Sequence, residues 1–313
     1  MSNEPKSVLA NGEPTSPPND TATERSKERA LEDDQCVPVI VKRSDALRRH
    51  PDDALEHTIQ EGLEQLERPI LSLFLSSIAA GLIVGFSAMA VAIVVVATAD
   101  LESPLWSRLL MAAVYPLGFV MCVMSGAQLF TEHTATAVYP VLDRKAPLSR
   151  LFRLWSIVVV GNLAGAILCA ALLTSVDDVT GAREGYVEIG RHLVEFPLLP
   201  LLISALLAGW LMALGAWLVV STPPGIGQFA SIYIVTFLIG LGGFHHSIAG
   251  SAEVFTAFFI SDHFTATQCA SFIGVALLGN LIGGSVFVAL LNYAHIRKTQ
   301  EMTEHGSKDD LAH

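Results

Sequence analysis

Two adjacent histidines, His245 and His246, stand in the middle of an apolar run that extends from about Phe229 to Ile260. An imidazole can donate or accept a hydrogen bond and can take up a proton near neutral pH. At membrane depth such a side chain is by default part of an ion or proton pathway. In the alternative interpretation, which the histidines alone leave open, both rings only hydrogen-bond a neighbouring helix.

The run around the histidines is too long for one simple crossing, because about 20 apolar residues span the hydrocarbon core of a bilayer. It is interrupted by Gly240, Gly242, Gly243 and Gly250. Non-helical backbone is tolerated at membrane depth only where protein or a water-filled cavity surrounds it. The stretch from Gly240 to Glu253 is therefore predicted to be a broken helix that lines a transport path.

The composition places this helix in a membrane protein. Of the 313 residues, 51% are hydrophobic and 16% are charged, whereas soluble domains carry about 25% charged residues. The formal net charge of −11 comes largely from the tail and the loops, so it says little about partners. No basic stripe of the kind that binds nucleic acid is present. We expect an all-α integral membrane protein embedded in the inner (plasma) membrane.

The order of apolar and polar segments predicts one transport domain between two polar ends. Residues 1–50 are rich in Ser, Pro, Asn, Lys and Glu and are expected to form a flexible tail. Residues 51–69 have the spacing of an amphipathic helix, which lies against the bundle or on the membrane surface. Residues 295–313 form a polar C-terminal tail. The domain between them, residues 70–294, contains six apolar segments, at about Leu71–Thr98, Leu105–Leu142, Leu154–Thr174, Phe196–Val220, Phe229–Ile260 and Ala270–Tyr293.

Basic residues near the span ends indicate the orientation, since loops rich in Lys and Arg stay in the cytoplasm. With a cytoplasmic N-terminus, Arg108, Arg183 and Arg191 fall outside. The inner side then holds the larger set of Arg68, Arg144, Lys145, Arg150, Arg153, Arg297 and Lys298. Both termini are therefore predicted to be cytoplasmic, and the acidic loop from Asp177 to Glu195 is predicted to face outward.

The two halves of the transport domain resemble each other, which predicts a repeat of three spans, residues 70–175 and 196–294. Because three is odd, the second copy must cross in the opposite sense, as an inverted repeat with its site near the midplane. Spans two and five are then the paired broken segments. Three alignments carry the repeat: Ala80–Leu82 with Ala208–Trp210, Gly126–Thr131 with Ser251–Thr256, and Gly161–Gly165 with Gly279–Gly283.

The third alignment pairs two G-N-L-x-G motifs. Their glycines have the small-xxx-small spacing that lets helices pack closely. The asparagines between them, Asn162 and Asn280, have two interpretations that the sequence leaves open. Each bonds across helices, or each holds a broken loop and faces the pore.

At these motifs the chain resembles the formate/nitrite transporter (FNT) family, over about Glu67 to Tyr293. The resemblance implies six spans in an aquaporin-like fold, a pentamer with one pore per protomer, and passage of small monovalent anions, in some members with a proton. The motifs are G-A-Q-L-F-T-E-H from Gly126, G-N-L-A-G from Gly161, F-H-H-S-I-A-G from Phe244 and G-N-L-I-G-G from Gly279.

The resemblance also implies the pathway residues. His246 matches the central pore histidine, and Leu129, Phe130 and Thr131 match the loop that breaks the second span. Phe244 matches an apolar constriction, and Asn162 and Asn280 match the paired asparagines. The chain departs from the family pattern at His245, where an acid is expected, and at Gly250, Gly209 and Gln128, while Glu132 adds an acid beside the loop. These departures resemble the divergent YfdC-like branch and leave the substrate open.

Three classes of function remain to be compared. The first is a passive or proton-coupled path for a small weak-acid anion, in which His246 donates a hydrogen bond or lends the proton itself. The second is a channel for a small neutral solute on the same fold. The third, a membrane enzyme, is not expected, because the histidines and the four cysteines lack metal-ligand spacing. We expect no cofactor. His245 is a candidate pathway residue as well, but helical neighbours lie about 100° apart and cannot both face one narrow pore equally, so the alternative that it bonds backbone outside the path is favoured.

Overall fold

The computed structural model describes residues 51–299, and every regular element in this part of the chain is a helix. Five helices are long and apolar enough to cross a membrane, and the bent pair α13 and α14 makes a sixth. The predicted tail over residues 1–50 lies outside the described residues. The helices are α3 (Pro51–Glu67), α4 (Ile70–Ala97), α5 (Pro104–Val114), α6 (Pro116–Met124), α7 (Phe130–Thr136), α8 (Tyr139–Leu142), α9 (Leu148–Ser175), α10 (Asp177–Thr180), α11 (Arg183–Val194), α12 (Leu198–Ser221), α13 (Ile226–Gly242), α14 (Ser247–Ile260), α15 (Ala266–Gly284) and η1 (Ser285–Leu290).

The second apolar segment is interrupted between α6 and α7. Helix α6 ends at Met124, and Gly126, two residues later, has a φ of 70° in the left-handed region that favours glycine. The amides of Gly126 and Ala127 bond the carbonyls of Val123 and Cys122 at 3.0 and 3.2 Å. This pair of bonds is a Schellman motif, which stops a helix and turns the chain. The backbone then runs without helix to Leu129, and α7 begins at Phe130.

The fifth segment is interrupted by the same device between α13 and α14, which meet at 52°. Gly243 has a φ of 64°. The amides of Gly243 and Phe244 bond the carbonyls of Gly240 and Ile239 at 3.2 and 3.0 Å. Helix α14 then begins at Ser247. Both predicted breaks are therefore present, each set by one glycine in the left-handed conformation.

These motifs correct one alignment of the sequence analysis. The structural counterpart of Gly126 is Gly243, and Phe130 corresponds to Ser247 as the first residue of a half-helix. The alignment of Gly126–Thr131 with Ser251–Thr256 is therefore wrong. It matched similar letters inside α14, whereas the backbone repeats the turn that precedes that helix.

Close helix pairs form at the small residues of the G-N-L-x-G motifs. Helix α4 packs along α9, and α12 packs along α15. A Cβ atom added at Gly81 would strike the backbone of Asn162, and one added at Gly209 would strike the backbone of Asn280. The absence of a side chain at Gly209, one of the departures from the family pattern, thus allows α12 to approach α15.

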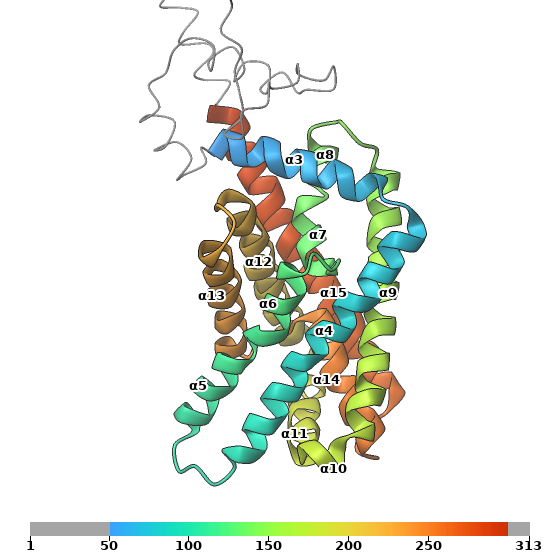
Figure 1. Ribbon diagram of the computed structural model, residues 1–313, viewed down its shortest axis with the longest axis vertical. Coiled ribbons are helices and arrows are strands. Elements are labelled where there is room, and N and C mark those ends of the chain that lie inside the picture. Colours follow the sequence, from blue (N-terminus) through green and yellow to red (C-terminus); the bar gives the residue numbers. More distant parts are fainter. Residues whose placement is uncertain (1–50, 300–313) are drawn as a thin grey trace, which may run out of the picture. The chain divides into compact units, whose positions relative to one another are not determined.

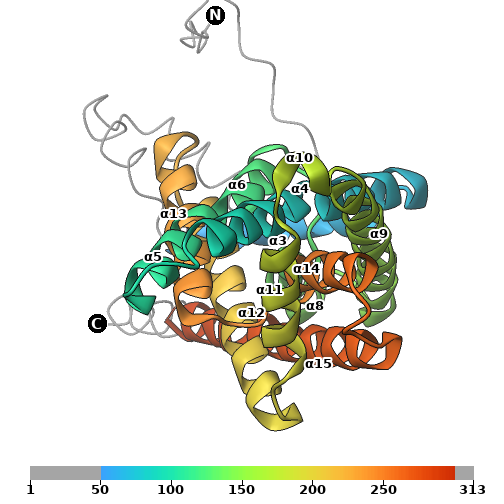
Figure 2. The same cartoon turned by 90° about the horizontal axis from the view of Figure 1, so that it is seen from below.

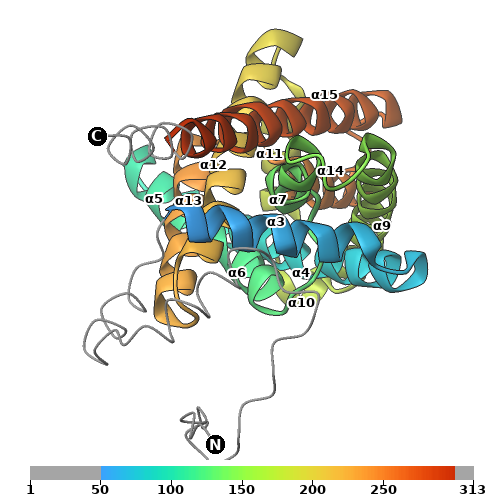
Figure 3. The same cartoon turned by 90° about the horizontal axis from the view of Figure 1, so that it is seen from above.

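Helix α3 lies across one end of the helices that follow it (Figures 1 and 3). Leu55, Ile59 and Leu66 on its inner face are buried, and it packs against α7, α8, α9 and α12. Of the two placements considered from the sequence, the apolar face therefore lies on the bundle.

The segment from Asp177 to Glu195, predicted to be a long loop between the third and fourth spans, is helical. It forms α10 and α11 at the end opposite α3 (Figure 1), and α11 lies beside α14 (Figure 2). Tyr186, Val187 and Leu193 are buried there, because their spacing puts them on one face of a helix.

The last span also runs further than expected. After the π-helical turn η1 the chain stays helical past His295 as far as Thr299. The predicted start of the polar tail at residue 295 is thus inside a helix, and residues 300–313 lie outside the described part of the chain.

Candidate functional site

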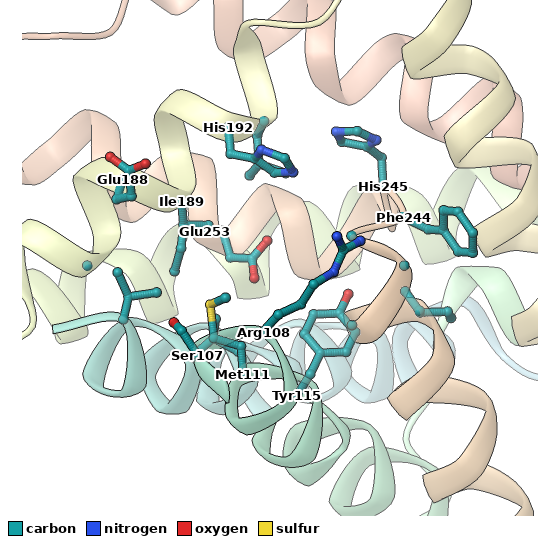
Figure 4. A pocket seen from close by; sticks show the side chains of 18 of the residues that line it. Ser107, Arg108, Met111, Tyr115, Glu188, Ile189, His192, Phe244, His245 and Glu253 are labelled. Carbon is teal, nitrogen blue, oxygen red and sulfur yellow. The ribbon is translucent and has the colours of Figure 1, made fainter. Parts of the chain in front are cut away.

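A cavity of about 1240 Å³ opens between α4, α5, α11, α12 and α13, on the side of α11. We call it the vestibule. Its wall is mostly apolar, and its polar lining includes Arg108, Tyr115, His192, His245 and Glu253 (Figure 4). Phe244 and His246, from the break between α13 and α14, also line it. The vestibule therefore reaches the second break directly.

His246 is the N-cap residue of α14. Its Nδ1 atom accepts a hydrogen bond from the amide of Ala249 at 3.2 Å, so the side chain caps the helix. Because Nδ1 is occupied as an acceptor, the proton of the neutral ring lies on Nε2. Nε2 is 2.9 Å from Oγ1 of Thr131, and it therefore donates to that hydroxyl. The edge of the His246 ring packs against Phe119, with ring centroids 4.9 Å apart.

This bond joins the two broken spans. Thr131, the second residue of α7, is fully buried, as is Leu129, and Phe130 is 3% exposed. His246 lines the vestibule. Glu132, next to Thr131, lines a separate cavity of about 20 Å³ on the side of α13, a volume that holds about one water molecule. The His246–Thr131 pair therefore lies where the two broken segments meet, with a different cavity beside each partner.

Asn162 holds the first break. Its Nδ2 group donates to the carbonyls of Ser77 and Gln128, both at 2.8 Å, and its Oδ1 accepts from the amide of Phe130 at 2.9 Å. The side chain thus ties α4, the non-helical loop and the start of α7 together.

Asn280 holds the second break in the same pattern. Its Nδ2 donates to the carbonyls of Ala205 and His245 at 2.7 and 3.1 Å, and its Oδ1 accepts from the amide of Ser247 at 2.7 Å. Both asparagines are fully buried. In each amide one N–H bonds a neighbouring helix, and the other N–H and the oxygen bond the break. The two interpretations therefore combine: each asparagine bonds across helices and holds a broken loop, but neither is among the residues that line the vestibule.

His245, the last of the candidate pathway residues, lies on the vestibule wall and not outside the path, as helical geometry had favoured. Its Nδ1 atom is 2.7 Å from Oγ of Ser204, which also accepts the His245 amide at 3.2 Å. The ring stacks on His192 at 6.1 Å and meets the edge of Phe196 at 5.3 Å. The 100° step between helical neighbours does not apply to His245, because this residue lies in the non-helical break.

Gly250, another departure from the family pattern, makes room for an aromatic ring behind His245. A Cβ atom at this position would lie 2.5 Å from Cζ of Phe272. The Phe272 ring packs against His245 with centroids 5.9 Å apart. An aromatic contact therefore occupies the place of a polar side chain next to the break.

Five further residues of the vestibule wall are not among the predicted pathway residues: Arg108, Tyr115, His192, Ser204 and Glu253. Glu253 could have been found, because seven residues after His246 it returns to nearly the same face of α14. The others come from α5, α11 and α12. Only the packing of those helices brings them to the vestibule, and no spacing along the chain signals it.

A charged cluster joins the elements at the α3 end. Asp143 follows α8 and accepts bonds from Arg297 and, at 3.0 Å, from Tyr293, while Lys145 lies 3.0 Å away. Lys145 also reaches Glu56 on α3 at 3.6 Å. Burial alone would raise the pKa of Asp143, but the bonds from Lys145, Arg297 and Tyr293 outweigh it, and the pKa lies below its ordinary value.

Comparison with known proteins gives a consistent result for sequence and fold. A family model described as "Formate/nitrite transporter" matches residues 52–294. The "Inner membrane protein YfdC" of Escherichia coli is 33% identical over 247 residues, which cover 77% of each chain. A solved "FNT family ion channel" has a TM-score of 0.71 at 21% identity, over 78% of this chain and 99% of that one. A "Pentameric formate channel with formate bound" has a TM-score of 0.62 at 21% identity, over 72% and 97%.

The family match covers most of the chain and all the apolar helices. It confirms the resemblance read from the motifs and the all-helical membrane fold. The two solved structures are similar in fold, and both are named as channels. This chain is a multi-pass membrane protein that belongs to the formate/nitrite transporter family.

Proposed function

We propose that this chain forms a path for a small monovalent weak-acid anion of the formate or nitrite type. The observation that carries the proposal is the hydrogen bond between His246 and Thr131 at the meeting point of the two breaks. A solute that passes between them must replace this bond. An anion oxygen can do so, because it accepts from Nε2–H of His246 and from the hydroxyl of Thr131.

A proton assists the crossing in this proposal. A bare anion among buried apolar groups such as Leu129, Phe130 and Phe119 is costly. The hydrogen-bond donors of His246 and Thr131 stabilise the anion where the two breaks meet. A proton bound to the anion removes its charge while it passes the apolar groups. Of the two roles considered for His246, the cap on α14 favours the neutral donor. A proton on Nδ1 would face the amide of Ala249 and break that cap.

The alternative is a channel for a small neutral solute. The acidic lining of the vestibule favours it, since Glu184, Glu188 and Glu253 share that cavity with the single arginine Arg108 among its lining residues. An anion entering without a proton meets this negative charge. The rate of an anion path assisted by a proton depends on the concentrations of both the anion and the proton. The rate of a neutral-solute channel depends on the concentration of the solute alone.

Assembly and location complete the proposal. One of the two similar solved structures is named as a pentamer, and we infer a homo-pentamer here. Large apolar side chains are exposed on the outer helices for lipid or for neighbouring copies, among them Leu71, Trp106, Phe152, Leu199 and Ile226. The E. coli relative is named an inner membrane protein, and we place this chain in that membrane with the α3 end cytoplasmic.

The deciding experiment uses purified full-length protein in sealed liposomes. We expect labelled formate to accumulate faster than in protein-free liposomes when the inside is made alkaline, and the imposed pH gradient to drive it. The matched measurement replaces formate by labelled urea as a neutral solute of similar size. Uptake of urea with no gradient-driven formate uptake would replace the anion path by the neutral-solute channel.

A further inference from the structure

Glu253 is a buried carboxylate that points into the vestibule. It lies on α14, seven residues after His246, and is 6% exposed. Figure 4 shows its carboxylate directed into the cavity rather than into the protein. Within residues 51–299 no hydrogen bond or ion pair reaches this carboxylate. A buried carboxylate without a donor is costly, so the cavity holds a place where a donor group on a solute would be stabilised.

Arg108 and Tyr115 approach the same space from α5. The guanidinium of Arg108 donates its Nε–H to the carbonyl of Leu241 at 2.6 Å, which fixes the plane of the group against α13. Its remaining N–H groups and the Tyr115 hydroxyl are turned toward the cavity near Glu253 (Figure 4). Arg108 and Glu253 do not form an ion pair with each other in the described structure. A cation and an anion therefore face one cavity with room between them.

The Arg108 guanidinium and the Glu253 carboxylate together fit a solute that accepts a hydrogen bond at one end and donates one at the other. A small oxyacid does both, since one oxygen accepts from the guanidinium and the second shares a proton with the carboxylate. Two carboxyl groups that share a single proton are a known stable arrangement. The remaining ionisable groups around the vestibule are Glu184, Glu188 and His192 on α11 and His245 and His246 at the break.

We propose that Arg108 and Glu253 form an outer binding site in the vestibule that takes a small oxyacid anion together with one proton. The inference rests on the proposed function and identifies where the cargo acquires its proton. The proton comes from the solution on the vestibule side and lies between the cargo oxygen and the Glu253 carboxylate. Only this proton changes place, and no covalent bond between heavier atoms forms or breaks. The oxyacid then moves toward His246 and carries the proton with it.

The test measures initial uptake of labelled formate into proteoliposomes at about pH 5.5 and about pH 7.5. Wild-type uptake should fall as the pH rises, because the site needs the shared proton. Glu253→Gln keeps the shape and donates an N–H to the bare anion. The ratio of uptake at the lower pH to uptake at the higher pH should be about tenfold smaller in this variant than in wild type, because one charge-assisted hydrogen bond changes binding by about that factor. Uptake at the higher pH should exceed that of wild type.

The matched control is Glu188→Gln. Glu188 lies on the same cavity, but its side chain is 61% exposed and pairs with Arg191, so its removal changes the charge without touching the site. It should keep the wild-type pH ratio. Arg108→Gln should raise the KM for formate about tenfold at both pH values, whereas Arg191→Gln should not change it.

The outcomes separate the two proposals. If wild type carries formate and Glu253→Gln keeps the wild-type pH ratio, whether its rate is unchanged or uniformly reduced, the carboxylate only supports the fold and the outer site is rejected. If Glu253→Gln does not assemble, Glu253→Asp decides, since its retracted carboxylate should raise the KM and keep the pH ratio. An unchanged KM then rejects the site. If wild type carries no formate at any pH, the proposed function itself fails.

Discussion

Thr131 and His246, from opposite halves of the described chain, meet with 2.9 Å between Oγ1 and Nε2. Each is the residue that its own break brings to this point: His246 caps α14, and Thr131 belongs to the first turn of α7. The bond thus couples the position of one half-helix to that of the other.

Thr131→Val removes the hydroxyl and keeps the volume of the side chain. We expect formate uptake to fall by about tenfold, because the pair loses one of the two donors available to an anion oxygen. The oligomer in detergent should be unchanged in size. Thr174→Val is the control, since Thr174 bonds only the carbonyl of Ala170 in its own helix. An equal loss of formate uptake in both variants would show that the Thr131 hydroxyl has no particular role in the pathway.

His246→Asn keeps a hydrogen-bonding group but removes the ring that reaches both Ala249 and Thr131. We expect the oligomer to persist, and both the rate and the pH dependence of formate uptake to change, because the donor at the pair is lost. His245→Asn should change the rate less, since its ring bonds Ser204 on the wall. A pH profile identical to wild type in His246→Asn would leave the imidazole a structural role only and favour the neutral-solute channel.

Asn162→Ala and Asn280→Ala should have similar effects on stability, because each removes three hydrogen bonds to buried backbone. Unpaired buried groups cost about 1–3 kcal/mol each, so each variant should lose several kcal/mol and unfold at a clearly lower temperature in detergent. Gln60→Ala, on the exposed face of α3, should leave the unfolding temperature where it is. A strong effect at only one asparagine would contradict the equivalence of the two breaks.

The Asp143 cluster predicts a pH dependence of stability. Its carboxylate has a pKa below the ordinary value in the folded chain, so the folded state binds fewer protons than the unfolded state. The contribution is present above the ordinary pKa, near 3.8, and is lost as the pH falls below that value. Asp143→Asn should lower stability at neutral pH by on the order of 1 kcal/mol and flatten the acid side of the profile. Asp178→Asn, on exposed α10, should keep the wild-type profile.

The proposed orientation can be tested by labelling single cysteines in intact cells. In a background with the native cysteines replaced, a cysteine at Asp178 should react with an impermeant reagent applied outside, and a cysteine at Gln60 should react only after the membrane is opened. Both positions are exposed, at opposite ends of the described helices (Figure 1). Reaction of both from one side would overturn the six-span topology.

Much of the fold follows from patterns along the chain. Run lengths predicted the apolar helices, and the glycines beside the histidines, Gly243 among them, predicted the second break, because a left-handed residue at membrane depth strongly favours glycine. The first break was predicted from the repeat and the family resemblance, and the role of Gly126 in it was not predicted. The G-N-L-x-G spacing predicted close packing at its glycines, but not that the pairs are α4 with α9 and α12 with α15.

The site was less accessible to sequence reasoning. His246 and Thr131 were assigned through family resemblance, and their contact across 115 positions has no local signal. Helical angles favoured a place for His245 outside the path, but such angles do not apply to residues in a non-helical break. Arg108 and Tyr115 reach the vestibule only through the docking of α5, which depends on the packing of several helices at once.

The π-helical turn from Ser285 to Leu290 affects how related chains can be compared with this one. Such a turn accommodates more residues than an α-helical turn of the same rise, so it acts as a local insertion within the last span. A relative with a regular α-helix there would present Tyr293 and Arg297 on a different side of that helix. An ungapped alignment would then pair the glycines and Asn280 correctly and misassign the residues that reach Asp143.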